Sequence, residues 1–334
     1  MASPLVFITG GTGFIGSHVI LSTLKAGYRV LLSIRKPEQK DVITQRYSDY
    51  TSKIKTVVIP DMTKAESFED ALNDVTFVFH LASPMPGSGP DVRTDYVNPA
   101  VQATEAVLYA ALDFPQIKKV VVMSSALALL QVDAMDGDDV SVRDNTGEVI
   151  EVNLDNPFPD DLVGHGQKYA ASKIFAHQAT KAFLKNQKPH YILTTFHPVF
   201  VMGDSLIQNS AKDIDGINAF FWQGLFSAKP IIGTGWVHVR DVADAHVKAL
   251  EAPIETGTEF LLSLPGFPWE EAVDYIKAQY PNLGCKLEPP FGKRWTVDAS
   301  TAERILKMQW RPREEIIHDV IDQQLSFQAG VGGQ

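Results

Sequence analysis

The chain has 334 residues, of which 45% are hydrophobic, and its formal net charge at pH 7 is −10. This length and composition are ample for a buried core and exclude a disordered chain. The acidic balance, without a strongly basic stretch, argues against nucleic-acid binding, which needs cations to neutralise phosphates.

The chain has a single cysteine, Cys285. It excludes an internal disulfide and a zinc cluster, and predicts a reducing compartment such as the cytoplasm. The first strand begins within a few residues of the N-terminus, without a basic leader or a long apolar segment, so we expect no signal peptide and no membrane span. The dispersed histidines lack a metal-binding spacing, so no metal is predicted.

The first motif is "GGTGFIG", residues 10–16, which lies between a predicted strand at 5–8 and a predicted helix at 18–27. Glycine allows a tight turn and the close approach of another molecule to the backbone. A helix N-terminus that follows such a turn presents free N–H groups to an anion. Gly10, Gly13 and Gly16 therefore predict a dinucleotide pyrophosphate site.

Apolar runs then alternate with helical segments. We expect strands at 28–34, 54–60, 75–83, 117–125 and 190–201, and helices around 68–72, 97–112 and 169–184. Continuous β-branched runs between helices are typical of a parallel sheet that is buried on both faces. The predicted fold class is α/β, a doubly wound parallel Rossmann sheet with a smaller α+β cap.

We expect the Rossmann domain to span residues 1–202, including the catalytic residues. Residues 203–330 mainly form the cap, with some strand and helix returning to the Rossmann domain. Within the cap we expect an aromatic helix at 217–226, a strand-like segment at 235–250 and further elements at 269–280 and 301–310. Phe220, Phe221, Trp222 and Phe226 either wall the substrate crevice or pack in the core.

The second strand ends in "SIRKPEQK", with Arg35 and Lys36 and no acid before Glu38. NAD-binding sites carry an acid here for the ribose hydroxyls, whereas a 2′-phosphate favours arginine. The pattern therefore predicts NADPH as the cofactor, through Arg35 and Lys36. The alternative is a pair of solvent-facing bases at the start of a loop.

Tyr169 and Lys173 lie four residues apart on a predicted helix and so share one face. A neighbouring ammonium stabilises a phenolate, which suits tyrosine to proton transfer near neutral pH. Ser124 and Ser125 follow the fifth predicted strand, where the carboxyl ends of strands border the ligand crevice. A hydroxyl there can polarise a carbonyl, so Ser125, Tyr169 and Lys173 are the predicted catalytic residues.

The motifs "TGGTGFIG", "SSA" and "YAASK", in this order, resemble the extended short-chain dehydrogenase/reductase family over nearly the whole chain. In that family the serine that matches Ser125 positions the substrate oxygen, and the tyrosine that matches Tyr169 passes the proton. The lysine that matches Lys173 holds the nicotinamide ribose.

The segments "VFHLASP", "RDVADAHVKAL" and "STAERILKMQW" resemble the branch with dihydroflavonol reductases, cinnamoyl-CoA reductases and fungal aldehyde or ketone reductases such as methylglyoxal reductase. The branch places an asparagine like Asn98 near the active site, although a helix-surface role is open. His197 is expected to be a hydrogen-bonded histidine at the crevice rim, and not catalytic. The remaining cofactor-binding residues that these resemblances imply are Thr12, Phe14, Ile15, Asp61, Met62, Ala82, Ser83 and Pro198.

The predicted function is NADPH-dependent reduction of an aldehyde or ketone to an alcohol by hydride transfer, with tyrosine as the proton donor. The expected substrate is a neutral, apolar or aromatic small molecule, and polyketide-like compounds are among the candidates. Two alternatives stay open: an NAD-dependent nucleotide-sugar epimerase or dehydratase, and a non-catalytic NADP-sensing regulator. Residues 131–161 carry ten acids and one base. They are either a solvated excursion with a hairpin around residues 145–147, or a negative surface beside the crevice that disfavours polyanionic substrates. The oligomeric state cannot be read from the sequence.

Overall fold

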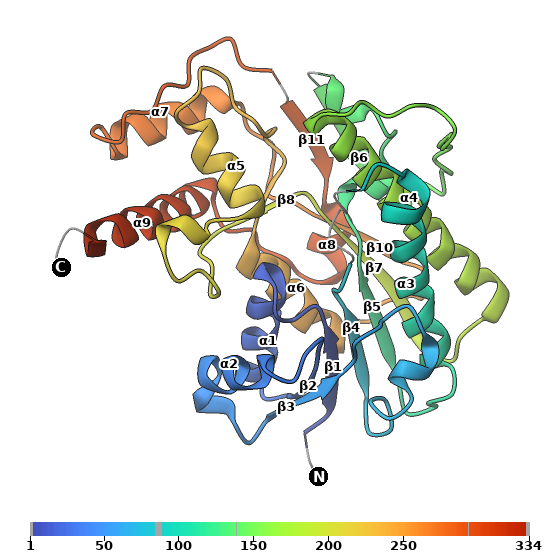
Figure 1. The fold of residues 1–334 in the computed structure, drawn as a ribbon. Helices are drawn as coiled ribbons and strands as arrows, with labels where there is room; N and C mark the ends of the chain where they lie inside the picture. The colour runs from blue at the N-terminus through green and yellow to red at the C-terminus, as the bar shows by residue number, and fades with distance from the viewer. Residues whose placement is uncertain (1–2, 84–88, 138, 293, 332–334) are drawn as a thin grey trace.

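A seven-stranded sheet forms the centre of the molecule in the computed structural model, which describes residues 3–83, 89–137, 139–292 and 294–331. The strand order is β10–β7–β5–β4–β1–β2–β3 (Figure 1), and all neighbouring strands are parallel. The order reverses between β1 and β4, where open α/β sheets bind ligands beyond the carboxyl ends of the strands. The doubly wound fold is therefore confirmed. The strands are β1 Leu5–Thr9, β2 Arg29–Ile34, β3 Ile54–Val58, β4 Phe77–His80, β5 Lys119–Met123, β7 Ile192–Pro198 and β10 Glu259–Leu262.

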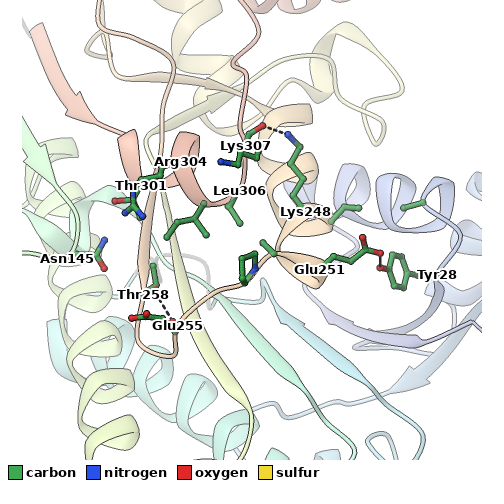
Figure 2. Close-up of a pocket in the computed structure, with 15 residues that line it drawn as sticks. Tyr28, Asn145, Lys248, Glu251, Glu255, Thr258, Thr301, Arg304, Leu306 and Lys307 are labelled. Carbon is green, nitrogen blue, oxygen red and sulfur yellow. Dashed lines mark hydrogen bonds between the residues drawn. The ribbon is translucent and has the colours of Figure 1, made fainter.

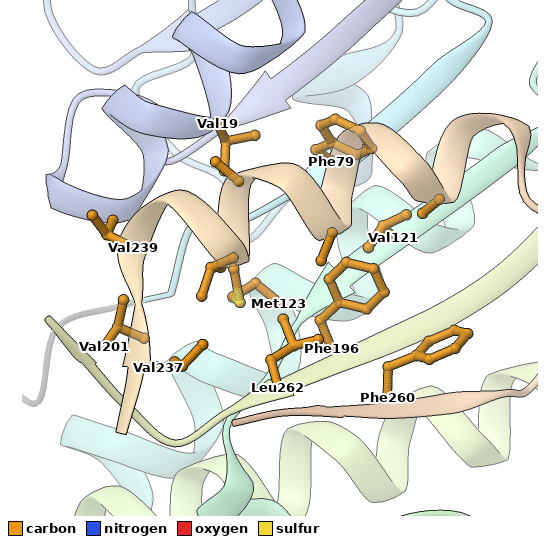
Figure 3. Packing of buried hydrophobic residues seen from close by; sticks show 14 of the residues in the cluster. Val19, Phe79, Val121, Met123, Phe196, Val201, Val237, Val239, Phe260 and Leu262 are labelled. Atoms are coloured by element: carbon orange, nitrogen blue, oxygen red, sulfur yellow. The ribbon is translucent and has the colours of Figure 1, made fainter. Parts of the chain in front are cut away.

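Helices cover both faces of this sheet (Figure 1). On one face α1 packs against α6, and on the other α3 packs against α4. Figure 3 shows α6 between Val19 of α1 and the sheet residues Met123 and Phe196, which belong to one buried apolar cluster. The helices are α1 Phe14–Lys25, α2 Gln39–Arg46, α3 Asn98–Ala111, α4 Leu162–Gln187 and α6 Val239–Glu251.

The cap contains α5, α7 and α9, which lie together at the upper left of Figure 1. Trp236, Phe221 and Trp269 form the centre of its own apolar core. Two small parallel sheets connect the cap to the rest, one of β8 with β9 and one of β6 with β11. The elements are α5 Gly216–Gly224, α7 Trp269–Gln279, α8 Ser300–Ile305, α9 Arg313–Val331, β6 Asp139–Arg143, β8 Phe200–Met202, β9 Trp236–His238 and β11 Arg294–Asp298.

Shorter helical turns link the longer elements. A π-helical turn spans Arg93–Val97, directly before α3. The 3₁₀ turns are Ser48–Tyr50, Ala65–Phe68, Ala126–Leu129, Ala134–Asp136 and Ala211–Asp213. The helix expected around residues 68–72 is wrong, because only the turn Ala65–Phe68 forms there.

The strand expected across residues 235–250 is also wrong, because only Trp236–His238 is strand and α6 begins at Val239. His238 caps this helix, since its ring accepts a hydrogen bond of 3.0 Å from the backbone N–H of Arg240. The apolar residues from Val239 to Leu250 recur with a helical period, and that face is buried against the sheet.

The hairpin expected around residues 145–147 does not form, because β6 pairs in parallel with β11. The following turn instead covers the edge of the large sheet. The side chain of Asn145 donates to the carbonyl of Glu259 at 2.9 Å and accepts from its backbone N–H at 2.9 Å. Asp144 accepts from the backbone N–H of Leu261 at 2.9 Å. These side chains replace a neighbouring strand and protect the edge at β10.

No helix in the described part of the chain is long and apolar enough to cross a membrane.

Candidate active site

The glycine turn between β1 and α1 has two structural glycines. Gly10 has a φ of +72°, and a Cβ on it would lie 2.6 Å from the backbone nitrogen of Ala82. A Cβ on Gly16 would lie 2.3 Å from the carbonyl oxygen of Gly10. Both positions therefore need glycine to fold.

Gly13 is different, because the nearest neighbour of a Cβ there would be the Gly10 oxygen at 3.6 Å. Gly13 is the N-cap of α1, and no side chain caps this helix end. Packing within the protein does not explain this glycine. Its bare backbone and the uncapped helix N-terminus suit an anionic group that approaches from the cavity.

A cavity of about 880 Å³ runs from this turn across the carboxyl ends of the strands. The predicted site residues that line it come from the sheet, the glycine turn and α4. They are Gly10, Thr12, Gly13, Phe14, Ile15, Gly16, Arg35, Lys36, Met62, Ala82, Ser83, Ser125, Tyr169, Lys173 and Pro198.

Asp61 is the exception, since it is not among the residues that line the cavity. Its carboxylate accepts hydrogen bonds from the hydroxyl and the backbone N–H of Thr63, at 2.6 and 3.0 Å. These bonds lower the pKa of Asp61 and close the turn after β3. Asn98 likewise does not line the cavity and is exposed at the start of α3.

Arg35 and Lys36 lie just beyond β2, with exposed side chains on the cavity. Their backbone N–H groups donate to Oε1 of Gln39 at 2.8 and 3.1 Å. Gln39 therefore shapes this loop, a role that the sequence did not reveal. Within the described ranges neither cation has an ion-pair partner, so both are available to an anionic ligand.

Ser125, Tyr169 and Lys173 all line this cavity. Oγ of Ser125 accepts a hydrogen bond of 3.2 Å from the backbone N–H of Leu127, so its own proton can be donated to a ligand. Nζ of Lys173 lies 5.4 Å from the centre of the Tyr169 ring and donates to Ser83 at 2.9 Å. The arrangement can hold a carbonyl oxygen between two hydroxyls and place a cation beneath them.

His197 is buried next to this site and does not line the cavity. Its Nδ1 lies 3.0 Å from the carbonyl oxygen of Ser125, and its Nε2 lies 2.8 Å from Oγ1 of Thr195. A carbonyl only accepts, so Nδ1 carries the proton. Burial lowers the pKa of His197 to about 3, so the ring is neutral and holds the Ser125 backbone.

The far half of the cavity is mostly apolar. Phe200 and Trp295 contribute aromatic rings whose centres are 5.2 Å apart. Trp295 was not predicted, and its position depends on Gly235, where a Cβ would lie 2.7 Å from the ring. Two exposed carboxylates, Asp213 and Asp215, also line this half. The other apolar residues here include Leu127, Pro198, Val201, Ile207 and Ile217.

The aromatic residues of α5 mostly serve the core of the cap. Phe221 is buried between Trp236 and Trp269, and Trp222 packs against Phe226. The cavity is lined instead by Gly216, Ile217 and Asn218 at the start of the helix. The described residues of 131–161 provide none of the lining, whereas Asp213 and Asp215 place carboxylates on the cavity itself.

Asp204, His238 and Asp319 place potential metal ligands within 4.8 Å of one another. Arg240 explains this cluster, since its guanidinium lies 2.7 Å from Asp204 and 3.1 Å from Asp319. His238 completes the network through Asp319 at 2.9 Å. The cluster is an ion-pair network that joins the loop after β8 to α9.

A second groove, of about 1020 Å³, lies at the opposite end of α6 (Figure 2). Two of its charged side chains are bound within the protein. Lys248 donates to the carbonyl of Lys307 at 2.6 Å, and Tyr28 donates to Glu251 at 3.0 Å. None of the predicted site residues line this groove, so its larger volume does not make it the site.

A doubly wound sheet with a glycine turn at its switch point defines the class of dinucleotide-binding Rossmann proteins. The chain belongs to the NAD dependent epimerase/dehydratase family, whose model matches residues 6–262. This confirms the family resemblance of the motifs.

Ketoreductase sphI of Aspergillus fumigatus is 39% identical to the chain over 98% of it and 99% of its own length. NADPH-dependent methylglyoxal reductase GRE2 of Saccharomyces cerevisiae is 26% identical to the chain over 98% of it and 99% of its own length. Among solved structures, Gre2 of Candida albicans in complex with NADPH has a TM-score of 0.80 at 25% identity, covering 97% of this chain and 99% of that one.

Proposed function

We propose that the protein is an NADPH-dependent carbonyl reductase that converts an aldehyde or ketone to an alcohol. One observation carries the proposal: a single cavity joins the glycine turn, the two cations after β2 and the cluster of Ser125, Tyr169 and Lys173. The ketoreductase and methylglyoxal reductase relatives, which match almost end to end, support the same reaction.

The residues of the nucleotide half fit NADPH. Gly13 and the uncapped N-terminus of α1 would hold the pyrophosphate. Arg35 and Lys36 would bind the 2′-phosphate, for which arginine offers paired donors. Lys173 would hold the nicotinamide ribose, and Met62, Ala82 and Ser83 would lie along the nucleotide.

When bound, NADPH supplies the hydride for the carbonyl carbon. Ser125 would donate its hydroxyl proton as a hydrogen bond to the carbonyl oxygen and so orient the substrate. Tyr169 would transfer its phenolic proton to the same oxygen as negative charge develops there. The ammonium of Lys173, 5.4 Å from the Tyr169 ring, would stabilise the phenolate that remains.

The preferred substrate is an uncharged carbonyl compound with an apolar or aromatic body. The apolar half of the cavity, with Phe200 and Trp295, would take this body. Asp213 and Asp215 would repel anionic substrates electrostatically. The single cysteine further favours a reducing compartment such as the cytoplasm as the place of action.

NADPH oxidation with a panel of neutral aldehydes and ketones tests the proposal, with alcohol formation measured in parallel. We expect turnover with NADPH and much less with NADH. The family also contains nucleotide-sugar epimerases and dehydratases, but Arg35 and Lys36 favour NADP over the NAD of such enzymes. Conversion of a nucleotide sugar without net NADPH consumption would overturn the proposal, and so would NADPH binding without turnover of any carbonyl.

A further inference from the structure

A second, small cavity is lined in part by Lys173. Its volume is about 10 Å³, the space that one water molecule needs. It shares five lining residues with the large cavity: Ala82, Ser83, Met123, Ser124 and Lys173. The rest of its wall comes from α3, α4 and the buried strands β5 and β7, and includes His177, Thr104 and Thr180.

His177 is 95% buried in this wall, by the 5% exposure of its side chain. Its Nε2 lies 3.0 Å from Oε1 of Glu259. Its Nδ1 is buried and has no hydrogen-bond partner among the described residues. A buried polar atom without a hydrogen-bond partner destabilises the folded state, so we expect Nδ1 of His177 to have a further partner.

The charge of Glu259 determines which hydrogen-bond role Nε2 of His177 takes. Burial acts to raise the pKa of Glu259, but the hydrogen bonds from His177 and from the backbone of Asn145 outweigh it and hold the pKa at about 2. Glu259 is therefore a carboxylate, which only accepts hydrogen bonds. A neutral His177 ring then carries its proton on Nε2, and its Nδ1 presents a bare lone pair that needs a donor.

We propose that the small cavity holds one ordered water molecule, which donates to Nδ1 of His177 and accepts from the ammonium of Lys173. The second proton of this water molecule has acceptors nearby. The hydroxyls of Thr104 and Thr180 already donate to the carbonyls of Ala100 and Ala176, both at 2.9 Å, so their oxygens remain free to accept. The site therefore offers the two to four polar partners that a buried water needs.

This water makes His177 a positioning residue for Lys173. Tyr169, Lys173, His177 and Lys181 recur every fourth residue along α4 and so share one face. Lys181 donates to Glu259 at 3.3 Å from the solvent side. The carboxylate thus acts on the catalytic ammonium through His177 and the water, while Ser83 holds the same ammonium from the other side. The role in catalysis rests on the proposed function, whereas the water site does not.

The other titratable groups around this site leave the arrangement undisturbed at neutral pH. Burial lowers the pKa of His80 to about 3, and the nearby charge of Lys173 acts in the same direction. His197, whose ring centre is 4.7 Å from that of His177, is held neutral by burial with a pKa of about 3. Neither ring therefore adds a positive charge next to Lys173.

Nitrogen-15 NMR of histidine-labelled protein tests the water site without turnover. His246 is the internal reference, because its Nδ1 binds the carbonyl of Val242 and its Nε2 is buried between Phe79 and Phe196 without a partner. We expect His177 to be the Nε2–H tautomer, with its Nδ1 resonance shifted upfield from the bare Nε2 of His246 by a hydrogen bond. A resonance at the position of the His246 Nε2, or a proton on Nδ1, would overturn the water site.

A matched pair of substitutions tests the positioning role. Ala100→Val adds methyl groups at a residue that lines the small cavity, whereas Ala103→Val makes the same change at a buried residue of α3 outside it. We expect Ala100→Val to displace the water, to return the Nδ1 resonance toward the bare value and to lower kcat about tenfold by misplacing Lys173. Ala103→Val should leave the Nδ1 resonance at its wild-type position. Its kcat should change by less than about twofold, well below the loss expected for Ala100→Val.

Equal kcat values for the two folded variants would overturn the positioning role. If Ala100→Val does not fold, Thr180→Val replaces it, since this change removes a water acceptor at nearly constant volume. Failure of the wild-type protein to reduce any carbonyl, with the expected NMR spectrum, would contradict the proposed function alone.

Discussion

Lys173 donates a hydrogen bond of 2.9 Å to the hydroxyl of Ser83, which joins the middle of α4 to the segment that follows β4. The lysine side chain is 94% buried by its 6% exposure, so this contact holds an ammonium at a defined place beneath the cavity. Tyr169 lies one helical turn earlier, with its ring centre 5.4 Å from Nζ. The proposed proton donor is therefore positioned by regular helix geometry and needs no mobile loop.

Tyr169→Phe should lower kcat roughly 10²- to 10⁴-fold, the usual contribution of a general acid. NADPH affinity should change little, because the substitution removes only the phenolic oxygen. Single-turnover kinetics and cofactor titration measure the two effects. A variant that keeps wild-type turnover under conditions where chemistry limits the rate would exclude Tyr169 as the proton donor.

Arg35→Ala should weaken NADPH binding much more than NADH binding, because only NADPH carries a 2′-phosphate. Loss of a charge-assisted hydrogen-bond pair predicts an increase in the Kd for NADPH of about tenfold or more. Dissociation constants of both cofactors test this difference in affinity. The control is Arg46→Ala, in the last turn of α2 and away from the cavity. Equal losses for the two cofactors would show that Arg35 does not contact the phosphate.

Two glycine variants separate folding from binding. Gly16→Ala should destabilise the protein by about 1–3 kcal/mol, because its Cβ would lie 2.3 Å from a backbone oxygen. Gly13→Ala should leave the free energy of unfolding nearly unchanged, since its Cβ would make only an ordinary contact of 3.6 Å with the Gly10 oxygen, and should weaken NADPH binding, because Gly13 lines the cavity. Urea unfolding and cofactor titration distinguish the two. Unchanged NADPH affinity in Gly13→Ala would remove this glycine from the binding site.

Buried neutral histidines should make stability depend on pH. Burial lowers the pKa of His246 to about 4 and that of His197 to about 3, below the value of about 6.5 in an unfolded chain. Their contribution is complete above pH 6.5 and is lost as pH falls toward the folded pKa. Between pH 7 and 5 the loss approaches about 2 kcal/mol for each histidine.

His246→Phe should therefore flatten the dependence of unfolding free energy on pH between 7 and 5. The phenyl ring suits the space between Phe79 and Phe196. The matched control is His190→Phe, at an exposed histidine, which should keep the wild-type slope. An unchanged slope in His246→Phe would show that this histidine does not carry the effect.

The sequence predicted the parts of the site that depend on local pattern. The glycine turn, the strand ends and the four-residue spacing of Tyr169 and Lys173 all arise within short segments. The sequence did not predict contacts between distant segments. Trp295 reaches the cavity only because β11 pairs with β6, and Asp144 and Asn145 act on the edge strand β10 over more than a hundred residues.

The sequence also left open whether residues 131–161 form a solvated excursion or a negative surface beside the crevice, because charge density along the chain does not say which way a segment faces. In the structure this segment joins β11 and the sheet edge, while two carboxylates from another segment line the cavity. A segment can therefore be rich in acidic residues and still lie outside the lining of the site.

Asp213 and Asp215 should disfavour anionic substrates. In water, two like unit charges about 8 Å apart repel each other by about 0.5 kcal/mol. Neutralising either carboxylate should therefore raise kcat/KM for an anionic ketone about twofold. A neutral ketone of the same apolar bulk should be unaffected by Asp213→Asn and Asp215→Asn. The control is Asp160→Asn, in the acidic segment outside the cavity lining. Because salt screens these charges, the difference between the two ketones should narrow as ionic strength rises. Efficient turnover of a CoA thioester by the wild-type protein at low salt would contradict this electrostatic selection.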